Sequence, residues 1–186
     1  MDPSAAGHAF GRGRSQVPYS SDEGKAWLAD RLIALAPRTV LDIGAGWGTY
    51  ARLLRPLLPG CHIIGIEVHE PYVERFGLGD LYDELIVADV REIELPATDV
   101  AILGDILEHL PLPDAVTLWG RVRRAARTTL ASLPIVEYPQ GTSEGNVHEV
   151  HRHTWDHGQV LALGGVVAHQ TGRQIGVYEA SHLETP

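Results

Sequence analysis

Three glycines follow an acidic residue early in the chain, in the sequence D-I-G-A-G-W-G at residues 42–48. Glycine lets the backbone turn tightly and lets a ligand lie against it without a clash with a Cβ atom. A loop of this kind between a strand and a helix usually binds a nucleotide. Dinucleotide loops have the spacing G-x-G-x-x-G and receive a pyrophosphate, whereas this loop reads G-x-G-x-G and begins with Asp42, which would repel phosphate. The pattern favours a cationic ligand, and the alternative is a tight turn without a ligand.

Acidic residues also end the next two predicted strands. Glu67 lies where an acid accepts hydrogen bonds from both ribose hydroxyls of a bound nucleoside. Asp89 is placed to accept from an adenine amino group while Val90 packs on the ring, although an Asp that caps a turn is equally plausible there. After the fourth strand, the small Gly104 would leave space for a ligand, and Asp105 or the backbone that follows it would face the reacting centre. S-adenosylmethionine, which carries an ammonium and a sulfonium group and no phosphate, fits these features.

Four of the ten histidines lie within residues 146–157. Imidazoles bind zinc or iron, but the H-E-V-H sequence at 148–151 is one residue shorter than the helical H-E-x-x-H pattern. We therefore expect no metal site. Histidine also suits proton transfer near neutral pH, which makes His148 and His151 candidate catalytic residues.

His109 and the segment 153–155 are predicted to have different roles. His109 is a third candidate catalytic residue, with helix packing as the alternative. The segment 153–155 is predicted to be structural, with Thr154 as a helix N-cap and Trp155 packed in the core.

The elements that position these residues alternate between strand and helix along the chain. Strands are predicted at 39–43, 62–67, 85–88, 99–103, 128–133, 166–170 and 174–179. Helices are predicted at 20–35, where Ser20 and Glu23 match a capping box, and at 48–54, 71–76, 113–127 and 155–163. This order predicts an α/β fold, a doubly wound and mostly parallel seven-stranded sheet with an antiparallel C-terminal hairpin strand.

Length and composition limit the classes of function. The 186 residues predict a flexible tail at 1–18 and a single domain at 19–186. Fifteen basic against 24 acidic residues give a net charge of −9, which disfavours binding to nucleic acid. A lone cysteine, Cys61, together with the lack of a leader or a long apolar run, indicates a cytoplasmic protein without a membrane segment.

The sequence V-L-D-I-G-A-G-W-G at 40–48 and the sequence I-L-E-H-L at 106–110 resemble motifs of the class I S-adenosylmethionine-dependent methyltransferases, small-molecule type. The predicted late hairpin is also typical of that family. The resemblance implies S-adenosylmethionine as the cofactor and methyl transfer to an O or N atom of a small molecule. It implies that the cofactor is bound by Asp42, Gly44, Ala45, Gly46, Glu67, Val68, Asp89, Val90, Gly104, Asp105 and Ile106.

Other functions remain open at this stage. The chain could methylate RNA or protein, or bind the cofactor without turnover, and it could form a homodimer. A nicotinamide-dependent enzyme is disfavoured by the glycine spacing. Tyr19 could close over the cofactor.

Overall fold

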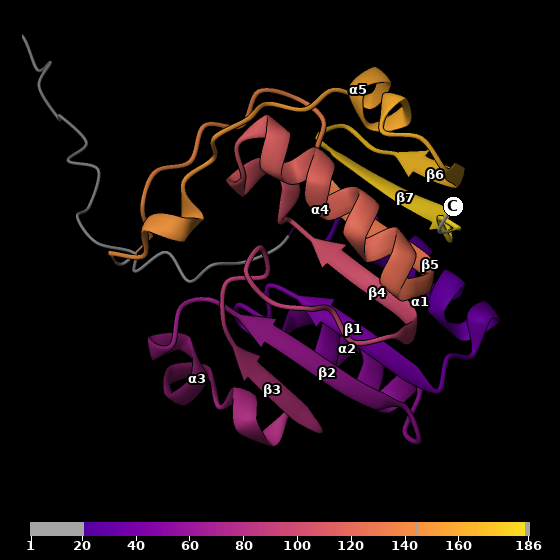
Figure 1. Ribbon diagram of the computed structural model, residues 1–186, viewed down its shortest axis with the longest axis vertical. Coiled ribbons are helices and arrows are strands. Elements are labelled where there is room, and N and C mark those ends of the chain that lie inside the picture. Colours follow the sequence, from indigo (N-terminus) through magenta and orange to yellow (C-terminus); the bar gives the residue numbers. More distant parts are fainter. Residues whose placement is uncertain (1–20, 144, 185–186) are drawn as a thin grey trace, which may run out of the picture.

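Seven strands form one sheet in the order β3-β2-β1-β4-β5-β7-β6, in a computed structural model that describes residues 21–143 and 145–184 (Figure 1). The strands are β1 Thr39–Ile43, β2 His62–Glu67, β3 Glu84–Val87, β4 Thr98–Gly104, β5 Ala126–Pro134, β6 Val166–Thr171 and β7 Ile175–Ser181. The first five strands pair in parallel, and β7 is antiparallel to both β5 and β6. The predicted fold is confirmed.

Helices cover both faces of this sheet. They are α1 Lys25–Leu35, α2 Thr49–Leu57, α3 Pro71–Phe76, α4 Leu112–Ala125 and α5 His157–Ala162, with short 3₁₀ turns η1 Leu78–Asp80, η2 Leu107–His109 and η3 Val147–Glu149. No helix of the described residues is long and apolar enough to cross a bilayer.

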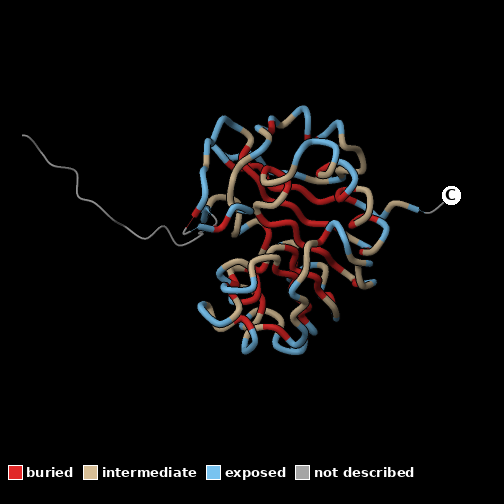
Figure 2. The backbone as a smooth tube through the Cα atoms, turned by 60° about the vertical axis from the view of Figure 1, so that its left-hand side comes forward, coloured by how far each residue is buried: buried red, intermediate tan, exposed pale blue. Residues whose placement is uncertain are grey.

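The core has two layers because successive strand residues point to opposite faces. In β1, Val40 packs in the layer under α1 and α2, whereas Leu41 and Ile43 pack in the layer under α4 and α5. The central strands are therefore buried on both sides, as the buried segments through the middle of Figure 2 show. This rigid centre fixes the positions of the loops that leave it.

The parallel strands all end at the same edge of the sheet. In Figure 1 the arrowheads of β1 to β4 point to one side, where η3 also lies. Ligand sites of doubly wound sheets form at this edge. The loops after β1, β2, β3, β4 and β5 carry the residues that the sequence analysis singled out.

Helix α1 begins differently from the prediction. Its N-cap is Gly24 in a left-handed conformation, without a side-chain cap, and Ser20 of the expected capping box lies outside the described residues. The Glu23 carboxylate instead accepts hydrogen bonds from the backbone N–H groups of residues 173, 174 and 175, at 2.5, 3.0 and 2.9 Å. Glu23 thus ties the start of α1 to the β6–β7 turn.

Replacing Glu23 with alanine should lower the unfolding temperature by a few degrees, because three N–H groups lose their acceptor. These hydrogen bonds hold the pKa of Glu23 below its usual value of 4.5. The stabilisation is therefore complete above that value and is lost as the pH falls through the folded-state pKa. Melting curves at about pH 7 and about pH 3 should show a smaller difference between the two proteins in acid. A Glu94→Ala variant serves as the surface control, and an equal difference at both pH values would contradict this account.

Other helix ends also differ from the sequence prediction. Helix α4 ends at Ala125 and not at residue 127, because β5 already begins at Ala126. Helix α2 continues through Pro56 to Leu57 instead of ending at residue 54. A proline so close to the end of a helix removes only one backbone hydrogen bond. Helix α5 is capped by Asp156, whose side chain forms a capping box with Gln159, so the predicted N-cap Thr154 is wrong. The predicted tail at 1–18 and Tyr19 lie outside the described residues.

Candidate active site

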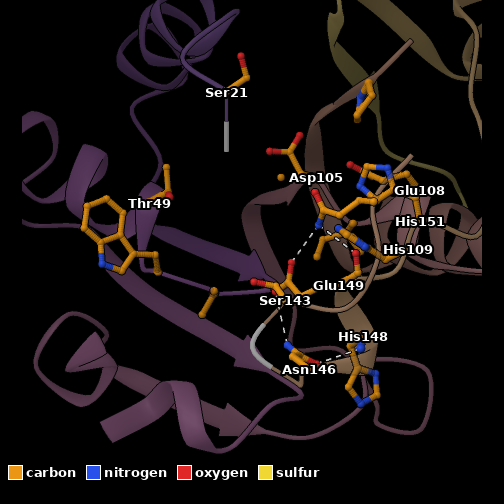
Figure 3. Close-up of a pocket in the computed structure, with 18 of the residues that line it drawn as sticks. Ser21, Thr49, Asp105, Glu108, His109, Ser143, Asn146, His148, Glu149 and His151 are labelled. Carbon is orange, nitrogen blue, oxygen red and sulfur yellow. Dashed lines mark hydrogen bonds between the residues drawn. The ribbon is translucent and has the colours of Figure 1, made fainter. Parts of the chain in front are cut away.

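A cavity of about 450 Å³ lies at the carboxyl edge of the sheet (Figure 3). One side is the glycine loop after β1, and the other side comes from the loop after β4 and the segment 138–151 after β5. The sequence-predicted residues that line it are Gly44, Ala45, Gly46, Glu67, Val68, Gly104, Asp105, Ile106, His109, His148 and His151. A smaller adjoining cavity of about 80 Å³ is lined in part by Asp89 and Val90. Most of the predicted site residues therefore meet at one place.

Glu67 is fixed at the floor of the larger cavity. Its two carboxylate oxygens accept hydrogen bonds from the backbone N–H groups of Gly46 and His69, each at 2.7 Å. Burial raises the pKa of this carboxyl, and the two N–H groups oppose the rise. Each oxygen keeps a second lone pair, so a carboxylate held in this way still has room to accept from a ligand hydroxyl.

Asp42 does not reach either cavity, contrary to the expectation that it meets the cofactor. It is 1% exposed and lies on the same face of β1 as Val40, because the side chains of a strand alternate. One of its oxygens accepts a hydrogen bond from the Tyr82 hydroxyl at 2.6 Å. Burial raises the pKa of Asp42 to about 7. Asp42 acts behind the glycine loop and not as a wall of the cavity.

Two glycines of the site are required by neighbouring side chains. A Cβ atom on Gly104 would collide with the ring of Tyr50, and one on Gly44 would collide with Ile106. Gly44 also has φ = 79°, in the left-handed region. The absence of a side chain at Gly104 thus makes room for the ring of Tyr50, whereas the sequence suggested that it makes room for a ligand.

Asp105 holds a strained backbone conformation beside the cavity. Its φ of 55° is unusual for a residue other than glycine, and its N–H donates to the carbonyl of Ser132 at 2.7 Å. Strain of this type is retained at sites where the surrounding structure enforces it. The turn directs the following segment, 106–109, along the cavity wall.

Glu108, His109 and His151 gather at one end of the cavity, away from Thr49, as Figure 3 shows. The rings of His109 and His151 meet edge to face with centroids 4.8 Å apart. Burial and the neighbouring His151 lower the pKa of His109 to about 4, and burial also lowers the pKa of His151. Both imidazoles are therefore neutral at pH 7.

The segment 138–153 is docked on this wall through backbone contacts. The N–H groups of Arg152 and His153 donate to the carbonyl of Glu108 at 2.8 and 3.2 Å. His153 packs edge to face on the buried Trp155, which agrees with the structural role predicted for these two residues. Docking at Glu108 is what brings His151 next to His109.

Glu149 lines the cavity, although the sequence suggested it only as a possible metal ligand and not as part of a cofactor or acceptor site. Its carboxylate accepts from Tyr72 at 3.3 Å, Asn146 at 3.4 Å and Gln140 at 3.3 Å, and burial raises its pKa. Its position in the cavity depends on Tyr72 of α3 and on Gln140 and Asn146 of the loop after β5.

The ionisable side chains that line the larger cavity include several acids and no lysine or arginine among the described residues. The four acids are Glu67, Asp105, Glu108 and Glu149. Such a surface disfavours phosphate and favours a cation. Two arginines of α4 serve the fold: Arg121 donates to the carbonyls of residues 90, 91 and 93, and Arg123 donates to that of Ser181.

The comparisons with known proteins agree with this geometry. A profile described as a methyltransferase domain matches residues 40–129. The N-terminal domain of EvdMO1, solved with S-adenosylhomocysteine bound, superposes with a TM-score of 0.64 at 18% identity and covers 88% of this chain and 83% of that one. Residues 40–129 thus match a methyltransferase domain, and the chain has the fold of a protein that binds S-adenosylhomocysteine.

Two methyltransferases resemble this chain over shorter parts of their length. Mitomycin 7-O-methyltransferase MmcR has a TM-score of 0.60 at 17% identity, with 87% of this chain and 59% of that chain covered. A tRNA (guanine-N(7)-)-methyltransferase of Burkholderia mallei is 33% identical over 119 residues, which are 61% of this chain. The chain spans only 42% of the length of that relative.

Proposed function

We propose that this protein binds S-adenosylmethionine in the two cavities and transfers its methyl group to a small molecule. The observation that carries the proposal is the acid-lined cavity without lysine or arginine among its described residues. A phosphorylated cofactor would meet four carboxyl groups there, whereas the sulfonium and ammonium groups of S-adenosylmethionine would be attracted.

The residues present fit that cofactor. Glu67 offers two fixed carboxylate oxygens to the ribose hydroxyls. The smaller cavity, whose lining includes Ile66, Ala88 and Val90, suits the adenine ring. Asp89 is placed to accept from the adenine amino group, although its carboxylate already pairs with Arg91 at 2.6 Å.

When bound, the cofactor would supply a methyl group carried on a positively charged sulfur atom. Transfer of that methyl group would leave S-adenosylhomocysteine, and the acceptor atom would gain the methyl group and lose a proton. The chain contributes alignment of the two reactants, which is the main requirement of such a displacement. The end of the cavity with His109 and His151 is assigned to the acceptor, and these side chains face the atom that loses its proton. Tyr138 extends the same wall.

A small-molecule acceptor is supported by the size of the cavity and by the net charge of −9. The mitomycin 7-O-methyltransferase is a small-molecule enzyme of similar fold. The resemblance to tRNA methyltransferases makes RNA the second candidate. A filter-binding assay with total tRNA at low salt separates the two, because an RNA enzyme should retain tRNA and lose it as salt rises.

Thermal unfolding with added ligands tests the cofactor directly. S-adenosylhomocysteine at about 100 times its Kd should raise the unfolding temperature by roughly 5–10 °C. NAD at the same concentration serves as the control and should leave the unfolding temperature unchanged. A shift with NAD and none with S-adenosylhomocysteine would refute the proposal.

A further inference from the structure

The acceptor end of the cavity contains a carboxylate that the mechanism above leaves without a task. Glu108 is 2% exposed, and neither of its carboxylate oxygens has a hydrogen-bond partner among the described residues. A buried carboxyl without a partner costs several times more free energy than a hydrogen-bonded one.

The neighbours of Glu108 complete a set of metal ligands. One donor atom from each of Glu108, His109 and His151 lies within 4.8 Å of the others. Bonds of about 2.0–2.1 Å to a common ion require separations of roughly 3–3.5 Å, which small side-chain rotations can reach. Figure 3 shows the three side chains gathered at this wall, and His109 and His151 come from different loops.

The second coordination sphere is also in place for one ligand. The Nδ1 atom of His151 lies 2.6 Å from the carbonyl of Tyr138, and the carbonyl can only accept, so Nδ1 carries the proton. The lone pair is then on Nε2, which is the form that binds a metal. The Nδ1 atom of His109 is buried and has no partner among the described residues.

We propose that Glu108, His109 and His151 bind one divalent first-row transition-metal ion, such as Zn²⁺, at the acceptor end of the cavity. Two imidazoles with one carboxylate suit zinc, iron, manganese or cobalt better than magnesium or calcium. Three protein ligands leave a coordination position for substrate, as in catalytic zinc sites. This departs from the expectation of no metal site, which considered the histidine-rich segment without Glu108 and His109.

The position of the site defines a class of acceptor. An ion at this wall would bind an acceptor hydroxyl and lower its pKa, so that the hydroxyl proton is released to water before the methyl group arrives. This role of the ion rests on the proposed methyltransferase function, whereas binding of the ion does not.

Calorimetric titration of the EDTA-treated and desalted full chain with Zn²⁺ tests the site, and Co²⁺ gives a visible spectrum as a second readout. One ion per chain is expected. Glu108→Gln and His151→Ala should each weaken Zn²⁺ binding at least about 10-fold. His148→Ala, a histidine of the same segment outside the cluster, should keep the affinity within about twofold of the wild type.

Absence of Zn²⁺ uptake by the wild type, or equal affinity in the wild type and both cluster variants, would overturn the proposal. Titration of the same samples with S-adenosylhomocysteine separates the two proposals. Cofactor binding without Zn²⁺ uptake refutes the metal site alone. Zn²⁺ uptake that depends on the cluster, without any cofactor binding, refutes the proposed function and supports the metal site.

Discussion

Replacing Glu67 with alanine is expected to raise the Kd for S-adenosylhomocysteine at least about 100-fold, or about 3 kcal/mol. The substitution removes both acceptors for the ribose hydroxyls. It also leaves the N–H groups of Gly46 and His69 without their partner, and an unsatisfied buried donor costs roughly 1–3 kcal/mol. Calorimetric titration gives the Kd directly.

Two variants make that result specific. Glu67→Gln keeps the shape of the side chain and one acceptor oxygen, so its Kd should lie between those of the wild type and of Glu67→Ala. The exposed Glu94, which lines neither cavity, is the matched control, and its alanine variant should bind like the wild type. Unchanged affinity in Glu67→Ala with a normal melting curve would show that the cofactor lies elsewhere.

The second large effect concerns the rate of methyl transfer and is expected for a substitution of His151. His151→Ala should reduce kcat by about 100-fold, the range for a residue that acts on the transferred proton or positions the acceptor. The affinity for S-adenosylhomocysteine should stay within about twofold, because His151 lines only the larger cavity, at its acceptor end. Single-turnover methylation with a labelled cofactor, once an acceptor is found by screening, measures the step.

His62 provides the control for that experiment. It is an exposed histidine at the start of β2, at the opposite edge of the sheet from the cavity, and its alanine variant should turn over normally. Parallel losses of turnover and of cofactor affinity in His151→Ala would instead indicate that the segment 138–153 has lost its packing.

Much of the fold and the part of the site around the glycine loop and Glu67 follow from local sequence patterns. The alternation of strands and helices predicts the sheet, and the position of Glu67 at the end of a strand predicts a ligand-facing acid. The direction of Asp42 could not be predicted, because it depends on which face of β1 is covered by which helix. The hydroxyl that donates a hydrogen bond to Asp42 belongs to Tyr82, forty residues further along the chain.

The acceptor end was less predictable for a physical reason. Glu108 and His151 are distant in sequence, and they meet because the Glu108 carbonyl accepts from the backbone after His151. Backbone contacts of this kind leave no side-chain signature. The sequence could therefore indicate three histidines near the site without indicating which of them share a wall with a buried acid.

The division of the large cavity between strand ends and a single docked segment has an evolutionary consequence. The glycine loop and Glu67 are fixed by the rigid centre of the sheet, whereas His148, Glu149 and His151 all belong to one stretch of chain attached at its margins. Under the proposed function, changes confined to that stretch would alter only the part of the acceptor wall that it contributes, beside Glu108 and His109 of the loop after β4, while the donor half stays intact. In the proposed assignment, acceptor preference can therefore change during evolution without a loss of donor recognition.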